Sequence, residues 1–412
     1  MLVARSLGVE GQGIYAAALA FSGLWTTIWT LGVDASHTYL LAGRRRERGE
    51  ILGATIFWIA AFSLLTTPLY LAIAPWLVGA AGPAATAAIR LSAWAVPLLF
   101  AKAFLLSLFA GESRLDRFNA LNVLANLFLL ALLIAGFAAA GASPTVAVGA
   151  YIASLALLTV LASTWVIRQA RAERSRATLR SDLLRGSLAY GLAGHVGVLF
   201  AQFTYRFDQV LVTRFAGLEA LGFYSISVLL AEKLNHVANS VAIALFQRVS
   251  ASSPQEANLL TPRVCRLVLY LSSLGGAVLF VLSEFLVRLF YSSRFDGAVE
   301  PLRILLPGVV ALSLSRPLSG DLSGRGRRIG LTAAMGSAFV INLLLGIWWI
   351  PRHGIVGAAW ASVVAYAWQT IVLSFFFWRE SGVSPTRLFW PEAGDFAHLR
   401  TLLARVGRRN RG

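Results

Sequence analysis

Long apolar runs separated by short polar connections dominate the sequence. About 20 consecutive apolar residues suffice to cross the hydrocarbon core of a bilayer as an α-helix. Because each backbone polar group in lipid needs a hydrogen-bond partner within its own segment, we expect these runs to be helical. The pattern therefore predicts an all-α, polytopic membrane protein with about eleven full transmembrane helices. The runs are residues 13–36, 51–79, 90–111, 119–140, 146–168, 187–214, 219–248, 264–291, 298–322, 329–350 and 354–378.

The composition agrees with this pattern and excludes several other classes of protein. Hydrophobic residues make up 57% of the chain and charged residues 13%, against about 25% charged residues in an ordinary soluble domain. A soluble enzyme, a disordered chain and a nucleic-acid-binding domain are excluded, although the net charge is +17. The sequence has one cysteine, no metal-ligand spacing and no phosphate-binding loop. We therefore expect no catalytic residues, metal, cofactor or nucleic-acid partner.

Basic residues are concentrated in alternate connections between the apolar runs. Arginines crowd residues 44–48, 168–185 and 325–328 and the tail from residue 379, whereas residues 141–145 include none. The positive-inside rule places arginine-rich connections in the cytoplasm. Only two of the 36 basic residues are lysines, a preference typical of GC-rich bacterial genomes. We therefore predict a multi-pass protein of the bacterial inner (plasma) membrane with a cytoplasmic C-terminus.

An internal repeat divides the chain into two similar halves. Residues 2–15 (LVARSLGVEGQGIY) and 211–224 (LVTRFAGLEALGFY) agree at seven of fourteen positions, at a spacing of 209. Residues 148–154 (VGAYIAS) and 356–362 (VGAAWAS) agree at five of seven, at a spacing of 208. Two matches at almost the same spacing predict two six-helix bundles related by a parallel repeat, with an axis along the membrane normal.

The repeat sets the expected domain boundaries. We predict an N-terminal bundle at 1–175, a C-terminal bundle at 176–378 and a basic tail at 379–412. In the second copy an apolar helix precedes Leu211, whereas only Met1 precedes Leu2, so we expect the first helix of the first copy to be largely missing. Tight connections are predicted at four glycines, because glycine tolerates the backbone angles of turns. These are Gly8, Gly13, Gly217 and Gly222.

The repeated segments carry a family resemblance. LVARSLGVEGQGIY before an apolar helix, and FDQVLVTRFAGLEALGFY in the second half, resemble the polysaccharide exporter branch of the MOP superfamily (multidrug, oligosaccharidyl-lipid and polysaccharide exporters). A third stretch, INLLLGIWWIPRHGIVGAAWA, is similar to the final pair of helices in that branch. The resemblance covers residues 1–378, and the missing first helix departs from it. It implies a transporter that alternates access to a site between the bundles. The matching residues of the third stretch are Asn342, Pro351, Gly354, Gly357, Ala358, Ala359 and Ala361.

Ionisable residues within the predicted spans are the candidate functional residues, because charges in the bilayer are costly and usually functional. Lysine and arginine suit the diphosphate of a lipid-linked sugar. The predicted substrate-binding residues are Lys102, Lys233, Arg206 and Arg316. The residues predicted to pair with these bases, or to leave room for coupling to H⁺ or Na⁺, are Asp208, Glu232, His236, Asp321 and Asp34.

The tail has a separate prediction. Apolar side chains recur on one face of residues 393–409 and arginines on the other. This pattern is typical of a helix lying on an anionic membrane surface. Docking to another polysaccharide-assembly protein is the alternative.

The resulting hypothesis is a flippase for an undecaprenyl-diphosphate-linked oligosaccharide. The cargo would be an O-antigen, capsule or exopolysaccharide repeat unit. A drug or cation antiporter of the same superfamily is an alternative, but it predicts mainly acidic residues in the cavity. A lipid II flippase differs mainly in substrate and stays open. A membrane enzyme would need a sizeable outer domain, and the outer connections are short.

Overall fold

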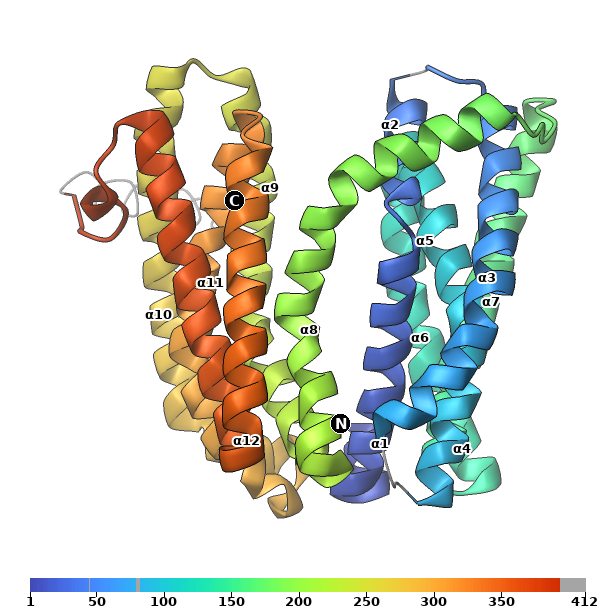
Figure 1. Cartoon of the computed structure of the whole chain (residues 1–412). Helices are drawn as coiled ribbons and strands as arrows, with labels where there is room; N and C mark the ends of the chain where they lie inside the picture. Colours follow the sequence, from blue (N-terminus) through green and yellow to red (C-terminus); the bar gives the residue numbers. More distant parts are fainter. Residues whose placement is uncertain (44, 79–81, 393–412) are drawn as a thin grey trace, which may run out of the picture.

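The computed structural model describes residues 1–43, 45–78 and 82–392, and within these ranges every regular element is helical. Figure 1 shows the elements as two bundles standing side by side. The α-helices are α1 (Leu2–Trp29), α2 (Val33–Ala42), α3 (Arg48–Val78), α4 (Pro83–Leu91), α5 (Ala95–Gly111), α6 (Leu115–Ala140), α7 (Pro144–Ala172), α8 (Ser181–Ala231), α9 (Asn235–Ala251), α10 (Pro254–Tyr291), α11 (Val299–Gly324) and α12 (Arg328–Ser381). Short 3₁₀ turns are η1 (Ser92–Trp94), η2 (Glu232–Leu234), η3 (Ser293–Ala298) and η4 (Pro385–Leu388).

The described chain crosses between the two ends of the molecule eleven times, as predicted. Eight of its helices are long and apolar enough to span a membrane, and the bent pair α1 and α2 makes a ninth span. Two of these helices, α8 and α12, have 51 and 54 residues and each merges two crossings at a glycine. Gly217 in α8 has φ 89°, and Gly354 in α12 has φ 56°, so the chain reverses at both positions.

The repeat is visible in the backbone. Gly8 and Gly217, which are 209 residues apart, both interrupt a helix with positive φ, at 72° and 89°. These left-handed turns require glycine, because a Cβ would strain the backbone there. The N-terminal bundle consists of α1 to α7 and the C-terminal bundle of α8 to α12 (Figure 1). The predicted boundary at residues 175 and 176 lies in the α7–α8 connection and stays a prediction.

The first predicted span is bent, which the hydropathy pattern did not indicate. The axes of α1 and α2 differ by 59° across the break at residues 30–32. Leu31 and Gly32 have φ values of 49° and 70° there. The break leaves polar backbone groups free of helical partners, and these groups face the first part of α8, as described below.

The arginine-rich connections lie together at one end of the molecule, which we call the arginine-rich end. The connections α2–α3 and α7–α8 lie at the top of the N-terminal bundle in Figure 1, and the α11–α12 connection lies at the same end. Ion pairs join the first two, because Arg46 lies 2.8 Å from Asp182 and Arg48 lies 2.7 Å from Glu173. The predicted tail helix at 393–409 falls outside the described residues.

Candidate functional site

A cavity of about 940 Å³ lies between the two bundles. Its walls come from α1, α2 and α5 of the N-terminal bundle and from α8, which connects the bundles. Glycines and short side chains on α1 and α8, such as Gly23 and Gly194, leave this space open. The volume falls within the usual range of ligand pockets, about 300–1,000 Å³. It is therefore large enough to hold a sizeable polar headgroup.

Two of the predicted basic residues line this cavity, one from each side. Lys102 is a partly buried residue of α5 and makes no ion pair or hydrogen bond with any described residue. Arg206 of α8 donates a 3.0 Å hydrogen bond to Glu232 in η2, and its side chain is 39% exposed. Since Glu232 balances Arg206, the lysine is the cation in the cavity wall that lacks a carboxylate partner among the described residues.

The break between α1 and α2 contributes polar groups to the same wall. Asp34 lines the cavity at the start of α2. The ring of His195, on α8, is buried and its Nε2 lies 3.2 Å from the carbonyl oxygen of Ile28, which the helix break leaves free. Gly32 and Gly191 pack so closely that a Cβ on either one would overlap the other's backbone. The break is thus held by α8.

Opposite the arginine-rich end, the repeated segments close the cavity against each other. A Cβ on Gly13 would overlap the carbonyl group of Leu218, and a Cβ on Gly222 would overlap that of Val9. The two contacts are equivalent, because 209 residues separate both Gly13 from Gly222 and Val9 from Leu218. Both glycines are helical, so the prediction of tight connections at these two positions is wrong. They serve close helix packing instead.

Two equivalent arginines extend this closure. Arg5 donates hydrogen bonds to the carbonyl oxygens of Leu289 and Phe290 at the end of α10. Arg214, its counterpart 209 residues later, lies with its guanidinium 5.8 Å from the ring centre of Trp76 at the end of α3. Each bundle therefore reaches across to the other through the same repeated position.

Six of the nine predicted residues, Glu232 among them, lie outside the cavity lining. Lys233 and His236 are exposed, and neither pairs with Arg206. The Glu232–Lys233–Leu234 turn is 3₁₀ rather than α-helical, so Glu232 and His236 do not share the regular α-helical face that the sequence suggested. Arg316 of α11 stacks 4.9 Å from the ring centre of Tyr205, which faces the interior of the C-terminal bundle.

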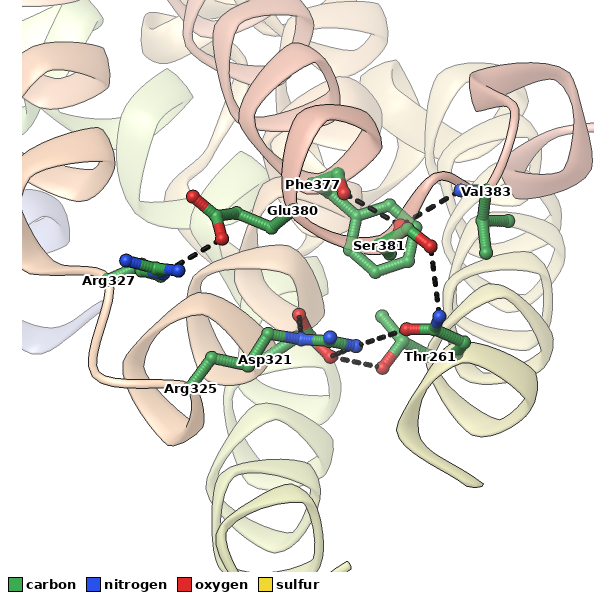
Figure 2. Close-up of polar contacts among 9 residues, drawn as sticks. Thr261, Asp321, Arg325, Arg327, Phe377, Glu380, Ser381 and Val383 are labelled. Carbon is green, nitrogen blue, oxygen red and sulfur yellow. Dashed lines mark hydrogen bonds and ion pairs between the residues drawn. The ribbon is translucent and has the colours of Figure 1, made fainter. Parts of the chain in front are cut away.

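The two buried aspartates have partners other than the predicted bases. Asp208 accepts hydrogen bonds from the Tyr224 hydroxyl at 2.6 Å and from the backbone N–H of Gln209 at 2.7 Å. Asp321 accepts one from the Thr261 hydroxyl at 2.7 Å and lies 2.7 Å from Arg325, as Figure 2 shows. Both therefore tie helices of the C-terminal bundle together and neither lines the cavity.

Sequence reasoning missed the uncharged polar lining. Gln202 and Gln209 flank Arg206 on one face of α8, at spacings of four and three residues. Tyr190, Thr27 and Thr30 line the cavity as well. The helical spacing of Gln202, Arg206 and Gln209 was the signal that could have found this face. The threonines gave no such signal because hydroxyls are common within apolar helices, where they bond to their own backbone.

Comparisons with known proteins agree with this architecture. A solved multidrug resistance MATE family transporter of the MOP superfamily, in an inward-facing conformation, has a TM-score of 0.76 at 14% identity, over 92% of this chain and 94% of that one. The lipid II flippase MurJ, in an inward closed conformation, has the same TM-score at 16% identity, over 92% and 86%. A MOP superfamily transporter from Pyrococcus furiosus has a TM-score of 0.62 at 15% identity, over 92% and 94%. These likenesses show the shared fold.

Sequence comparison identifies the family. No curated protein sequence matches the chain significantly. A MatE family model matches residues 195–348. The model of the polysaccharide biosynthesis protein family matches residues 1–251, which is more than half of the chain. The chain therefore belongs to the polysaccharide biosynthesis protein family and is a membrane transporter of the MOP superfamily.

Proposed function

We propose that this protein is a flippase that moves a polyprenyl-diphosphate-linked oligosaccharide from the cytoplasmic to the outer leaflet. The observation that carries the proposal is Lys102, which lies in the wall of a large cavity between the bundles and has no ion-pair partner among the described residues. A buried cation without a carboxylate is costly unless it meets an anion or water. The diphosphate of the substrate supplies that anion, and the saccharide occupies the cavity while the lipid chain stays in the bilayer.

The charge of the cavity distinguishes this proposal from drug or cation export. The MATE transporter and the lipid II flippase match the fold equally well, so the fold does not decide between them. A cationic drug would be repelled by Lys102 and Arg206 and has Asp34 as its acidic contact. A diphosphate is attracted by both bases. Lipid II is also a polyprenyl diphosphate, and the family match to polysaccharide biosynthesis favours an oligosaccharide repeat unit.

The closure of the cavity at one end supports a mechanism of alternating access. The backbone contacts of Gly13 and Gly222 shut the cavity opposite the arginine-rich end. With the arginine-rich end in the cytoplasm, this is the state that receives substrate from inside. Transport then requires the repeated segments to separate, so that the bundles rock about the site between them.

The chain offers a matched pair of variants for the test, because it has two lysines. Lys102 lines the cavity, whereas Lys233 is exposed outside it. In cells that lack the native gene, we expect Lys102→Ala to cut outward transport at least tenfold, so that lipid-linked oligosaccharide accumulates and surface polysaccharide falls. Lys102→Arg should retain part of the transport, and Lys233→Ala should match the parent protein at equal membrane levels.

Other outcomes would contradict the proposal. If Lys102→Ala and Lys233→Ala transport equally well, the cavity lysine does not hold the diphosphate. If deletion of the gene leaves lipid-linked intermediates and surface polysaccharide unchanged, the protein is not this flippase. Drug or ion efflux would then be assayed next.

A further inference from the structure

Three side chains form a stack where the cavity approaches the arginine-rich end. The rings of Tyr39, in the last turn of α2, and Tyr190, in the first part of α8, lie 4.5 Å apart and 13° from parallel. The guanidinium of Arg45, in the α2–α3 connection, lies 4.4 Å above the Tyr39 ring. Two groups this close to one ring centre cannot share a face. The faces of Tyr39 are therefore both occupied.

Tyr190 differs from Tyr39 because one face of its ring has no stacked partner among the described residues. Tyr190 is 39% exposed and belongs to the cavity wall. Gly194, one helical turn further along α8, also lines the cavity, and the space where its side chain would lie is open. The Tyr190 ring thus has one face free beside an open part of the cavity wall, and Tyr39 and Arg45 stack behind its other face.

The position of this ring argues against a role in anchoring the protein to the membrane. Tyrosines that mark a membrane interface lie on the lipid-facing surface, whereas Tyr190 faces the cavity. The position also argues against simple core packing, because a core tyrosine such as Tyr224 is fully buried. A stacked, supported ring loses little conformational entropy when a ligand covers it.

The chemistry of such a face selects its ligand. An aromatic ring has a negative face that attracts partly positive C–H groups, and a pyranose presents a face of C–H groups with hydroxyls around its edge. The same cavity wall also supplies polar partners for hydroxyls, among them Asp34 and Gln202. A prenyl chain would also cover the ring, but it has no use for these polar partners.

We propose that Tyr190 is the platform on which a saccharide ring of the substrate stacks, supported by Tyr39 and Arg45. The proposal rests on the flippase function proposed above and adds a determinant of specificity. Lys102 binds the diphosphate, which every such substrate shares. Tyr190 recognises the sugar, and this division predicts that the two residues affect different parts of the ligand.

Two water-soluble probes separate these parts: farnesyl diphosphate, and farnesyl diphosphate linked to a disaccharide. Binding to the purified full-length protein in detergent is measured by calorimetry. The parent protein should bind the disaccharide probe at least tenfold more tightly than farnesyl diphosphate. Tyr190→Leu, which keeps an apolar side chain but removes the flat ring, should abolish this preference and leave farnesyl diphosphate binding unchanged. Tyr190→Phe and Tyr190→Trp should keep the preference. Lys102→Ala should weaken the binding of both probes.

The results that overturn the two proposals are different. If Tyr190→Leu keeps the parent's preference for the disaccharide probe, or weakens the binding of both probes equally, Tyr190 is not a saccharide platform. The flippase proposal then stands. If the parent protein binds neither probe, the flippase proposal itself fails. The thermal unfolding midpoint of each variant controls for loss of folding.

Discussion

Within each bundle, a cluster of polar side chains joins helix ends at the arginine-rich end. The two clusters lie at equivalent positions of the repeat but consist of different residues. In the N-terminal bundle, Arg48 at the start of α3 lies 2.8 Å from Glu112 at the end of α5 and 2.7 Å from Glu173 at the end of α7. In the C-terminal bundle, Asp321 of α11 takes the place of Glu112, exactly one repeat spacing of 209 residues later. It binds Thr261 of α10 and Arg325, the residue that directly follows α11 (Figure 2).

The clusters differ in how the charges are placed. Arg48 joins three helices through two carboxylates, and the side chain of Glu173 is 47% exposed. Asp321 has a side chain that is 0% exposed, and its arginine directly follows the same helix, so neutral groups make the cross-helix ties. Arg325 also donates to Asn258 of α10, whose amide donates to the carbonyl oxygen of Ser381 at the end of α12.

This difference teaches that the repeat preserves which helix ends are joined rather than which residues join them. The cluster joins α3, α5 and α7 in the N-terminal bundle and the equivalent helices α10, α11 and α12 in the C-terminal bundle. The N-terminal cluster has a spare carboxylate, whereas Thr261 and Arg325 of the C-terminal cluster share the single carboxylate of Asp321. We therefore expect the same kind of substitution to be more damaging in the C-terminal bundle.

The largest effect is expected for Asp321→Ala. Removal of the carboxylate leaves the Thr261 hydroxyl without this acceptor and the Arg325 guanidinium without its carboxylate, so that Arg325 keeps only its hydrogen bond to Asn258 among the contacts described above. Loss of one partner of a buried ion pair typically costs about 3–5 kcal/mol. The free energy of unfolding of the purified protein in mixed detergent micelles measures the loss. Glu112→Ala is the matched control, and an equal loss for both variants would show that the two clusters do not differ in redundancy.

An intermediate effect is expected for Arg48→Ala. This substitution removes the cation that Glu112 and Glu173 share. Both carboxylates keep a 3.0 Å hydrogen bond from the side-chain amide of Gln169. A hydrogen bond to a charged group contributes about 1.5–3 kcal/mol, and partial exposure reduces this, so we expect a loss of about 1–2 kcal/mol. The same unfolding measurement tests it. A loss as large as that of Asp321→Ala would mean that Arg48 alone holds its three helices.

These clusters also show what the sequence could and could not predict. The apolar runs predicted all eleven crossings, because the bilayer allows little besides helices of that length. Arg206, Lys102 and Asp34, which were singled out as charges within the spans, lie in the lining of the cavity, and their roles stay predictions. The partners of Asp208 and Asp321 were not predictable, because their hydroxyl partners come from helices whose rotation the hydropathy pattern does not fix. The bend after α1 was missed because Leu31 and Gly32 interrupt no apolar run.

The smallest effect is expected for Glu173→Gln, and it should depend on pH. Burial opposes ionisation of Glu173, but hydrogen bonds from Arg48 and Gln169 outweigh it and hold the pKa of this carboxyl below its ordinary value. A depressed pKa in the folded state stabilises the protein above the ordinary pKa, and this contribution disappears as the pH falls through the folded value. At neutral pH and low salt the substitution should cost less than about 1 kcal/mol, because the side chain is half exposed. The unfolding midpoints of parent and variant should therefore converge as the pH is lowered below about 4. A difference that stays constant from neutral pH to this value would show that Glu173 acts through packing rather than charge, and the contrast with the buried Asp321 would then rest on position alone.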